Sequence, residues 1–167
     1  LAKSLTKQFG LSAQAERGFA QAFSSMSRRL KTPITVDPDM ESFGRYFFAQ
    51  DKIYLKDPKA IFHEIGHWAF DNILSIEDRI AYFDLLGSKY NSPKSWDRIF
   101  PFRRAFRAEN EAKLAAGELD QEAFNRYDAW MNSPNEAFAD MVSKYTNGHA
   151  IPTDDFISIV DKAKIAA

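Results

Sequence analysis

Residues 63–67 read His-Glu-Ile-Gly-His, which has the residue types and spacing of a metal site that carries its own base. Residues four apart on a helix lie on one face, so His63 and His67 can each place a ring nitrogen about 2.0–2.1 Å from one Zn2+. Glu64 lies beside that face, where its carboxylate can take a proton from a water on the metal. The segment therefore predicts a zinc-dependent hydrolytic site on a helix.

The alternative is that two surface histidines flank a glutamate by chance. The chain has only 3 histidines in 167 residues, so chance explains the pattern poorly. A real site also needs a helix whose other face is core, and the neighbouring residues supply apolar surface: Ile61, Phe62, Ile65, Trp68 and Ala69. We therefore favour the metal site.

A catalytic zinc usually has three protein ligands, so one more is needed. The extended motif HExxHxxGxxH is absent, because Phe70 and Ile73 occupy its Gly and last His positions. Asp71, four residues past His67, is displaced along the helix axis. His149 follows a predicted helix end, where a lone histidine is more often solvated. The best remaining ligand is Glu136.

Glu136 and Asp140 are four residues apart and share one face of a later predicted helix. With Glu136 on the zinc, Asp140 is placed to accept a hydrogen bond from the outer N–H of a ligand histidine. Glu136 also fits the third helical position of a capping box begun by Ser133, which requires no metal. Capping gives no role to Asp140, so we expect Glu136 to be the third ligand.

The elements that must position these residues can be read from caps and periodicity. Ser12 begins a helix over 13–30, and three strands are expected over 34–36, 44–49 and 52–55. Asp57-Pro58 then begins the helix that carries both histidines. Later helices are expected from Ser75 to Gly87, over 102–116, from Asp120 to Met131, from Ser133 to Thr146, and after a cap at Thr153, with a loop at 91–93.

The predicted fold class is therefore α+β, mostly helical, with a small sheet of about three strands before the HExxH helix. A length of 167 residues with 45% apolar content fits a single domain over 1–167. The chain begins at Leu1 rather than Met, so we expect it to be a fragment of a longer polypeptide. It shows neither a signal peptide nor a membrane-spanning run, which predicts a soluble protein, cytoplasmic or delivered as part of a larger one.

Composition narrows the function classes further. Cysteine is absent, which excludes disulfides, thiol nucleophiles and thiolate zinc sites. The net charge of -1 gives no general attraction to nucleic acid or to anionic membranes. Three arginines, Arg103, Arg104 and Arg107, alternate with Phe102 and Phe106, but such a pattern is more typical of a solvated helix face beside a core stripe. We expect neither a nucleic-acid nor a membrane partner.

Taken together, residues 63–67 and the later run Asn-Glu-Ala-Phe-Ala-Asp at 135–140 resemble the motifs of gluzincin metallopeptidases, including thermolysin and the catalytic domain of anthrax lethal factor. The likeness to lethal factor extends to a Pro-Thr-x-x-Phe-Ile stretch at 152–157. The chain is also similar to zincin domains embedded in large phage and toxin polyproteins. This resemblance implies a zincin-like fold and implies that strand 52–55 is the sheet edge that binds substrate.

The resemblance also implies residue roles: His63, His67 and Glu136 as zinc ligands, Glu64 as general base, and Asp140 supporting a ligand histidine. It leaves the group that stabilises the oxyanion open. No tyrosine stands just before Glu136. The alternatives are Tyr127, Tyr145 and His149, and His149 requires its loop to fold back.

The expected function is that of a zinc metallopeptidase, an endopeptidase acting on protein or peptide substrates. The alternative is a zincin-like metal-binding interaction module without turnover. The intact Glu64 favours the enzyme, because a structural metal site has no use for a base.

Overall fold

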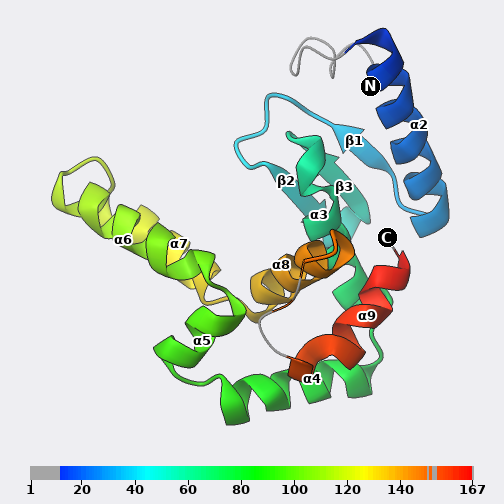
Figure 1. Cartoon of the computed structure of the whole chain (residues 1–167). Coiled ribbons are helices and arrows are strands. Elements are labelled where there is room, and N and C mark those ends of the chain that lie inside the picture. Colours follow the sequence, from blue (N-terminus) through cyan, green and yellow to red (C-terminus); the bar gives the residue numbers. More distant parts are fainter. Residues whose placement is uncertain (1–11, 150, 152–153, 167) are drawn as a thin grey trace.

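A computed structural model describes residues 12–149, 151 and 154–166 (Figure 1). The fold is α+β, mostly helical with one three-stranded sheet, as the sequence predicts. The predicted cap at Thr153 and the start of the 152–157 stretch lie outside the described residues. Across the described ranges, none of the helices is long and apolar enough to cross a membrane.

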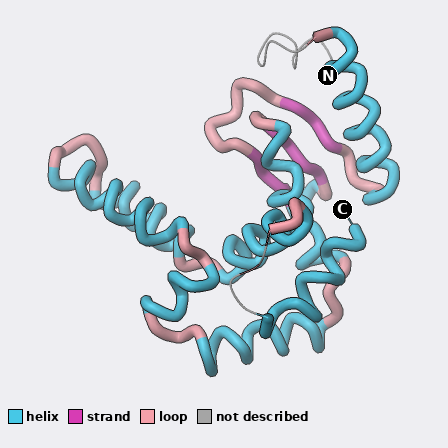
Figure 2. Tube along the Cα trace, in the orientation of Figure 1, coloured by secondary structure: helices cyan, strands magenta, loops and turns pink. Residues whose placement is uncertain are grey.

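The sheet contains β1 (Ile34–Val36), β2 (Gly44–Phe47) and β3 (Lys52–Leu55) in the order β1-β3-β2 (Figure 2). Strand β3 runs parallel to β1 and antiparallel to β2. The predicted hairpin is confirmed, although β2 stops at Phe47 because residues 48–50 form a 3-10 turn. Asp51 closes this turn at a φ of 47°, a left-handed conformation that Asp tolerates better than most residues.

The strand order corrects the prediction that 52–55 is the substrate-binding edge. Strand β3 is the central strand, with β1 on one side and β2 on the other, so its backbone groups are already paired. The free edge nearest the histidine helix belongs to β2. The resemblance to zincins implies an edge role for the strand before the histidine helix, but the pairing of this strand with both β1 and β2 gives it the central place.

Helix α3 (Ile61–Asn72) carries the two histidines and packs across the sheet. The chain enters it through a 3-10 turn, η2 (Pro58–Ala60), in which the predicted cap Asp57 accepts a hydrogen bond from the Lys59 N–H. Ile65 and Ala69 of α3 are buried, as are Ile53 and Leu55 on the sheet face beneath it. The apolar side of α3 thus forms the core, and its other side is left for the site.

Helix α8 (Pro134–Thr146) crosses α3 at close range. The two helices come close at Gly66, where an added Cβ would be 2.7 Å from Cα of Ala139. Helix α4 (Ile76–Lys89) fixes the start of α8, because the buried Tyr82 hydroxyl donates a hydrogen bond of 2.6 Å to the Pro134 carbonyl. The two motif-bearing helices therefore pack with their backbones close together.

The other helices are α2 (Ala13–Leu30), α5 (Pro93–Ile99), α6 (Phe102–Ala115), α7 (Gln121–Met131) and α9 (Ile157–Ala166), the last preceded by a 3-10 turn, η3 (Asp154–Phe156). Figure 1 shows α6 and α7 as a hairpin that projects from the rest of the molecule. Two predictions were wrong: α4 continues past Gly87 to Lys89, and the loop expected at 91–93 instead starts α5, where Ser92 forms a capping box before Pro93.

The arginines of α6 are mostly engaged within the protein. Arg103 is buried and donates hydrogen bonds to Asp97 and Asn132, which ties α6 to α5 and to the end of α7. Arg107 pairs with Glu111 and Asp128. The arrangement fits a structural role for this face.

Candidate metal centre

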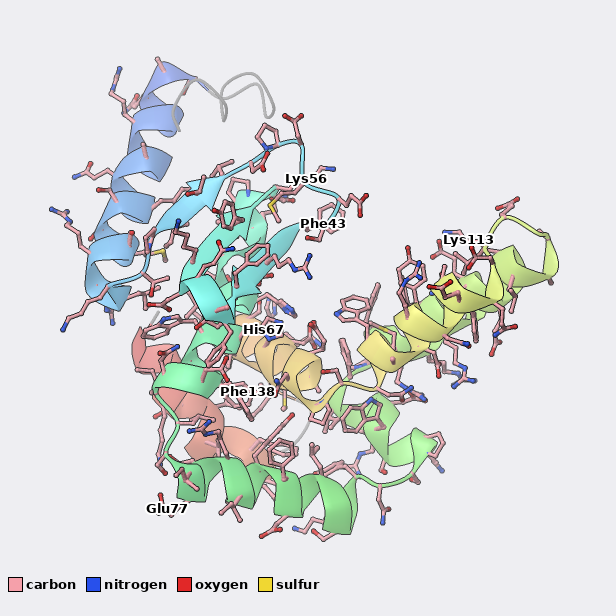
Figure 3. All side chains as sticks on the ribbon, turned by 180° about the vertical axis from the view of Figure 1, so that it is seen from behind. Phe43, Lys56, His67, Glu77, Lys113 and Phe138 are labelled. Atoms are coloured by element: carbon pink, nitrogen blue, oxygen red, sulfur yellow. The ribbon has the colours of Figure 1, made fainter. Side chains whose placement is uncertain are left out.

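Three predicted ligands converge where α3 meets α8 (Figure 3, which labels His67). The Nε2 atom of His63 lies 3.1 Å from one carboxylate oxygen of Glu136, and Nε2 of His67 lies 3.2 Å from the other. One ligand atom from each of the three residues lies within 4.8 Å of the other two. Side chains 73 positions apart in the chain thus face one point.

This donor set fits zinc. Two imidazole nitrogens and one carboxylate oxygen are the ligands of many catalytic zinc sites, which keep a fourth position open. With metal–ligand bonds of about 2.0–2.1 Å, neighbouring ligand atoms on a tetrahedron are about 3.3 Å apart. The two nitrogen–oxygen distances of 3.1 and 3.2 Å lie close to that value. These contacts run to the two different oxygens of Glu136, so a cation bound by all three residues would replace both of them.

Glu136 occupies the start of α8 in a way that serves two functions. Its backbone N–H donates to the Ser133 hydroxyl at 3.5 Å, which is one half of the predicted capping box. The other half is absent, because the Glu136 carboxylate turns to the two histidines. Burial works to raise the pKa of Glu136, but its hydrogen bonds with His63 and His67 outweigh burial and lower the pKa. The carboxylate is therefore ionised, as a ligand must be.

His63 responds to the same carboxylate. Burial acts to lower the pKa of His63, whereas its hydrogen bond with Glu136 and the charge of Glu64 act to raise it, and the net shift is upward. The ring is thus surrounded by negative charge. Such surroundings attract a cation, whether a proton or a metal ion.

Glu64 does not join the three ligands but turns toward the sheet edge. It is only 4% exposed, and an added Cβ on Gly44 would lie 2.7 Å from its Oε1 atom. The backbone N–H of Tyr46, two residues further along β2, donates a hydrogen bond to its carboxyl group. Burial raises the pKa of Glu64 despite the nearby histidines. A carboxyl group with a raised pKa beside a cation site is suited to proton transfer.

Asp140 lies one turn beyond Glu136, but its hydrogen bond is not the predicted one. Its carboxylate accepts a hydrogen bond of 2.7 Å from Lys144, one turn further along α8. The negative charge of Asp140 still contributes to the raised pKa of His63. Its support for the site is therefore electrostatic in this structure.

The three alternatives for the oxyanion-stabilising group lie elsewhere. Tyr127 packs edge-on against Phe106 in the α6–α7 hairpin. The Tyr145 hydroxyl donates to Asp161 on α9, and His149 lines a pocket together with Tyr145. In the part of the chain that the structure describes, no hydrogen bond or ion pair connects any of the three to the metal-site residues.

The contribution of β2 was missed from the sequence. A glycine at the start of a strand is a signal of close approach by another group, and Gly44 carries that signal because only a residue without a side chain leaves room for Glu64. The sequence could not predict that the Tyr46 N–H faces Glu64, because the direction of a backbone N–H in a strand depends on how the strands pair.

No protein family, curated protein or solved structure matches the chain. The interpretation of the site therefore depends on the chemistry and geometry of its own residues.

Proposed function

We propose that this chain is a zinc-dependent metallopeptidase of the gluzincin type, with His63, His67 and Glu136 as zinc ligands and Glu64 as general base. One observation carries the proposal: the two histidines of residues 63–67 share the carboxylate of Glu136, which sequence spacing alone had singled out. A metal-free His–Glu–His cluster would leave the buried Glu64 without a role, whereas a hydrolytic site requires it.

The arrangement of the elements supports a zincin-like fold. An antiparallel edge strand, a central strand and then the histidine helix follow one another in the chain, and the later glutamate helix packs across the histidine helix. The base lies between the cation site and the β2 edge. A peptide that adds to this edge through backbone hydrogen bonds brings its carbonyl groups beside both.

The proposed reaction assigns two proton transfers to Glu64. A zinc ion held by His63, His67 and Glu136 would lower the pKa of a water and polarise the scissile carbonyl. The Glu64 carboxylate accepts one proton from the water as the water oxygen bonds to the carbonyl carbon. Glu64 then gives that proton to the amide nitrogen as the C–N bond breaks, so that a carboxylic acid and an amine are formed. The raised pKa of Glu64 suits a group that must both take and release a proton.

The test compares zinc-loaded wild type with Glu64→Gln on a broad mixture of peptides, with zinc content measured for both proteins. We expect the variant to keep its zinc and to lose peptide cleavage by about a hundredfold or more. Equal inactivity of two zinc-bound proteins would contradict the proposal and support the alternative, a zincin-like metal-binding interaction module without turnover.

A further inference from the structure

The free edge of β2 presents its backbone beside the proposed base. The backbone groups of Ile53 and Leu55 face β1, because Ile53 N–H donates to Pro33 and the Leu55 carbonyl accepts from Asp37. The backbone groups of the alternate residues of β3 therefore face β2, where they pair with Arg45 and Phe47. The N–H and C=O groups of Gly44 and Tyr46 then point outward, away from β3. The hydrogen bond from Tyr46 N–H to Glu64 agrees with this direction.

The sheet face away from α3 is basic and aromatic at this edge. We define the open face as Arg45, Phe47, Lys52 and Tyr54, which alternate with the residues that face α3. The Arg45 guanidinium lies 5.0 Å from the centre of the Phe47 ring, and that ring packs edge-on against Tyr54. Within the described ranges, no carboxylate lies at ion-pair distance from Arg45. This edge arginine is exposed, oriented by an aromatic ring and available to a ligand.

We propose that the peptide segment bound along β2 carries an acidic side chain opposite Arg45, which makes acidic peptides the preferred substrates. This inference rests on the proposed function. A strand added to the free edge places one residue directly across from Arg45 and on the same face, with Cβ atoms about 4.5–5.5 Å apart. Opposite charges in such a cross-strand pair attract, and like charges repel. Arg45 thus selects a peptide side chain whose sequence neighbours in the peptide face the proposed metal site.

A peptide fits this surface better than a nucleic acid does. The outward N–H and C=O groups of Gly44 and the outward C=O group of Tyr46 offer donors and acceptors that another strand can match, while the Tyr46 N–H already bonds to Glu64. The edge also continues directly to Glu64, so that a bound peptide reaches the proposed reaction centre. A nucleic acid would use the charge of the open face but would leave the backbone groups of the edge unmatched.

The experiment measures two quantities with zinc-loaded full chain: cleavage of a peptide library by mass spectrometry, and binding of labelled library peptides to Glu64→Gln by fluorescence anisotropy. Asp or Glu at one fixed position should favour cleavage and binding about two- to fivefold over Asn or Gln. Adding Arg45→Glu should reverse the preference toward Lys or Arg at that position, while Arg45→Lys should keep it. Arg28→Glu, an equal charge change at an exposed site on α2, should leave it unchanged.

The two readouts separate this inference from the proposed function. Cleavage or binding whose charge preference is the same in wild type and Arg45→Glu overturns the role of Arg45 but leaves the peptidase intact. Binding that follows Arg45 without any cleavage contradicts the peptidase but supports the acidic ligand. Arg45-dependent binding of a labelled single-stranded oligonucleotide, with no selection among peptides, assigns the open face to nucleic acid and overturns the inference.

Discussion

At the scale of residues, the carboxylate of Glu136 and its backbone N–H do different work. The carboxylate lies between two imidazole rings, whereas the N–H is capped by Ser133. Spacing predicted both partners of Glu136, because helix periodicity fixes which residues share a face. It could not predict which partner the carboxylate chooses, since that depends on how α8 lies against α3.

Replacement of Ser133 by Ala should separate these two roles. The variant loses the helix cap, so the free energy of unfolding should fall by about 1 kcal/mol, measured by chemical denaturation. Zinc affinity, measured by competition with a chromophoric chelator, should stay within a few fold of wild type. A complete loss of zinc from a folded variant would show that the cap and the ligand cannot be separated.

Replacement of Gly44 by Ala should act on the base alone. The new Cβ would meet the Glu64 carboxyl at 2.7 Å and displace it from its position beside the proposed metal site. We expect peptide cleavage to fall by about a hundredfold, as small misplacements of catalytic groups do, with one zinc still bound. Wild-type activity in this variant would contradict the placement of Glu64.

At the scale of elements, the centre depends on the crossing of α3 and α8. Most helix boundaries could be predicted from caps, because Ser75, Asp120 and Ser133 each accept a hydrogen bond from the first turn that follows. The end of α4 could not, because an exposed glycine such as Gly87 is tolerated inside a helix that other contacts hold. The position of β3 also escaped prediction, since strand order depends on long-range pairing that periodicity does not encode.

Replacement of Gly66 by Ala tests this crossing. Its Cβ would lie 2.7 Å from the backbone of Ala139, so α3 and α8 must move apart. We expect a loss of about 1–3 kcal/mol in the free energy of unfolding, and weaker zinc binding because the ligands come from both helices.

The matched control is Gly87→Ala, because among the described residues nothing beyond its chain neighbours and its own helix backbone lies within 4 Å of the added Cβ. This change should raise stability by about 0.5–1 kcal/mol without an effect on zinc. Equal stabilisation by both substitutions would contradict the close packing at Gly66.

At the scale of the whole molecule, an ion pair joins distant parts of the chain. Lys162 on α9 donates to Asp78 at the start of α4, and these helices flank the α3–α8 pair. The hydrogen bond from Lys162 lowers the pKa of Asp78 more than partial burial raises it. Ionised Asp78 therefore favours the folded state.

The pH dependence of stability should reveal this pair. A carboxyl group whose pKa is lowered in the folded state stabilises the protein at a pH above its unfolded pKa of about 3.9. This stabilisation is lost as the pH falls through the folded pKa. The difference in unfolding free energy between wild type and Asp78→Asn should have its largest value above about pH 5 and should decrease below about pH 4. A difference that stays constant over this range would contradict the ionic contribution.

The most direct test of the central claim is the zinc content of dialysed protein, measured by mass spectrometry of the metal. The account predicts one zinc per chain in wild type, its loss in His63→Ala and Glu136→Ala, and its retention in Asp71→Ala, the neighbouring acid outside the cluster. Full zinc retention in folded Glu136→Ala would contradict the proposed metal centre.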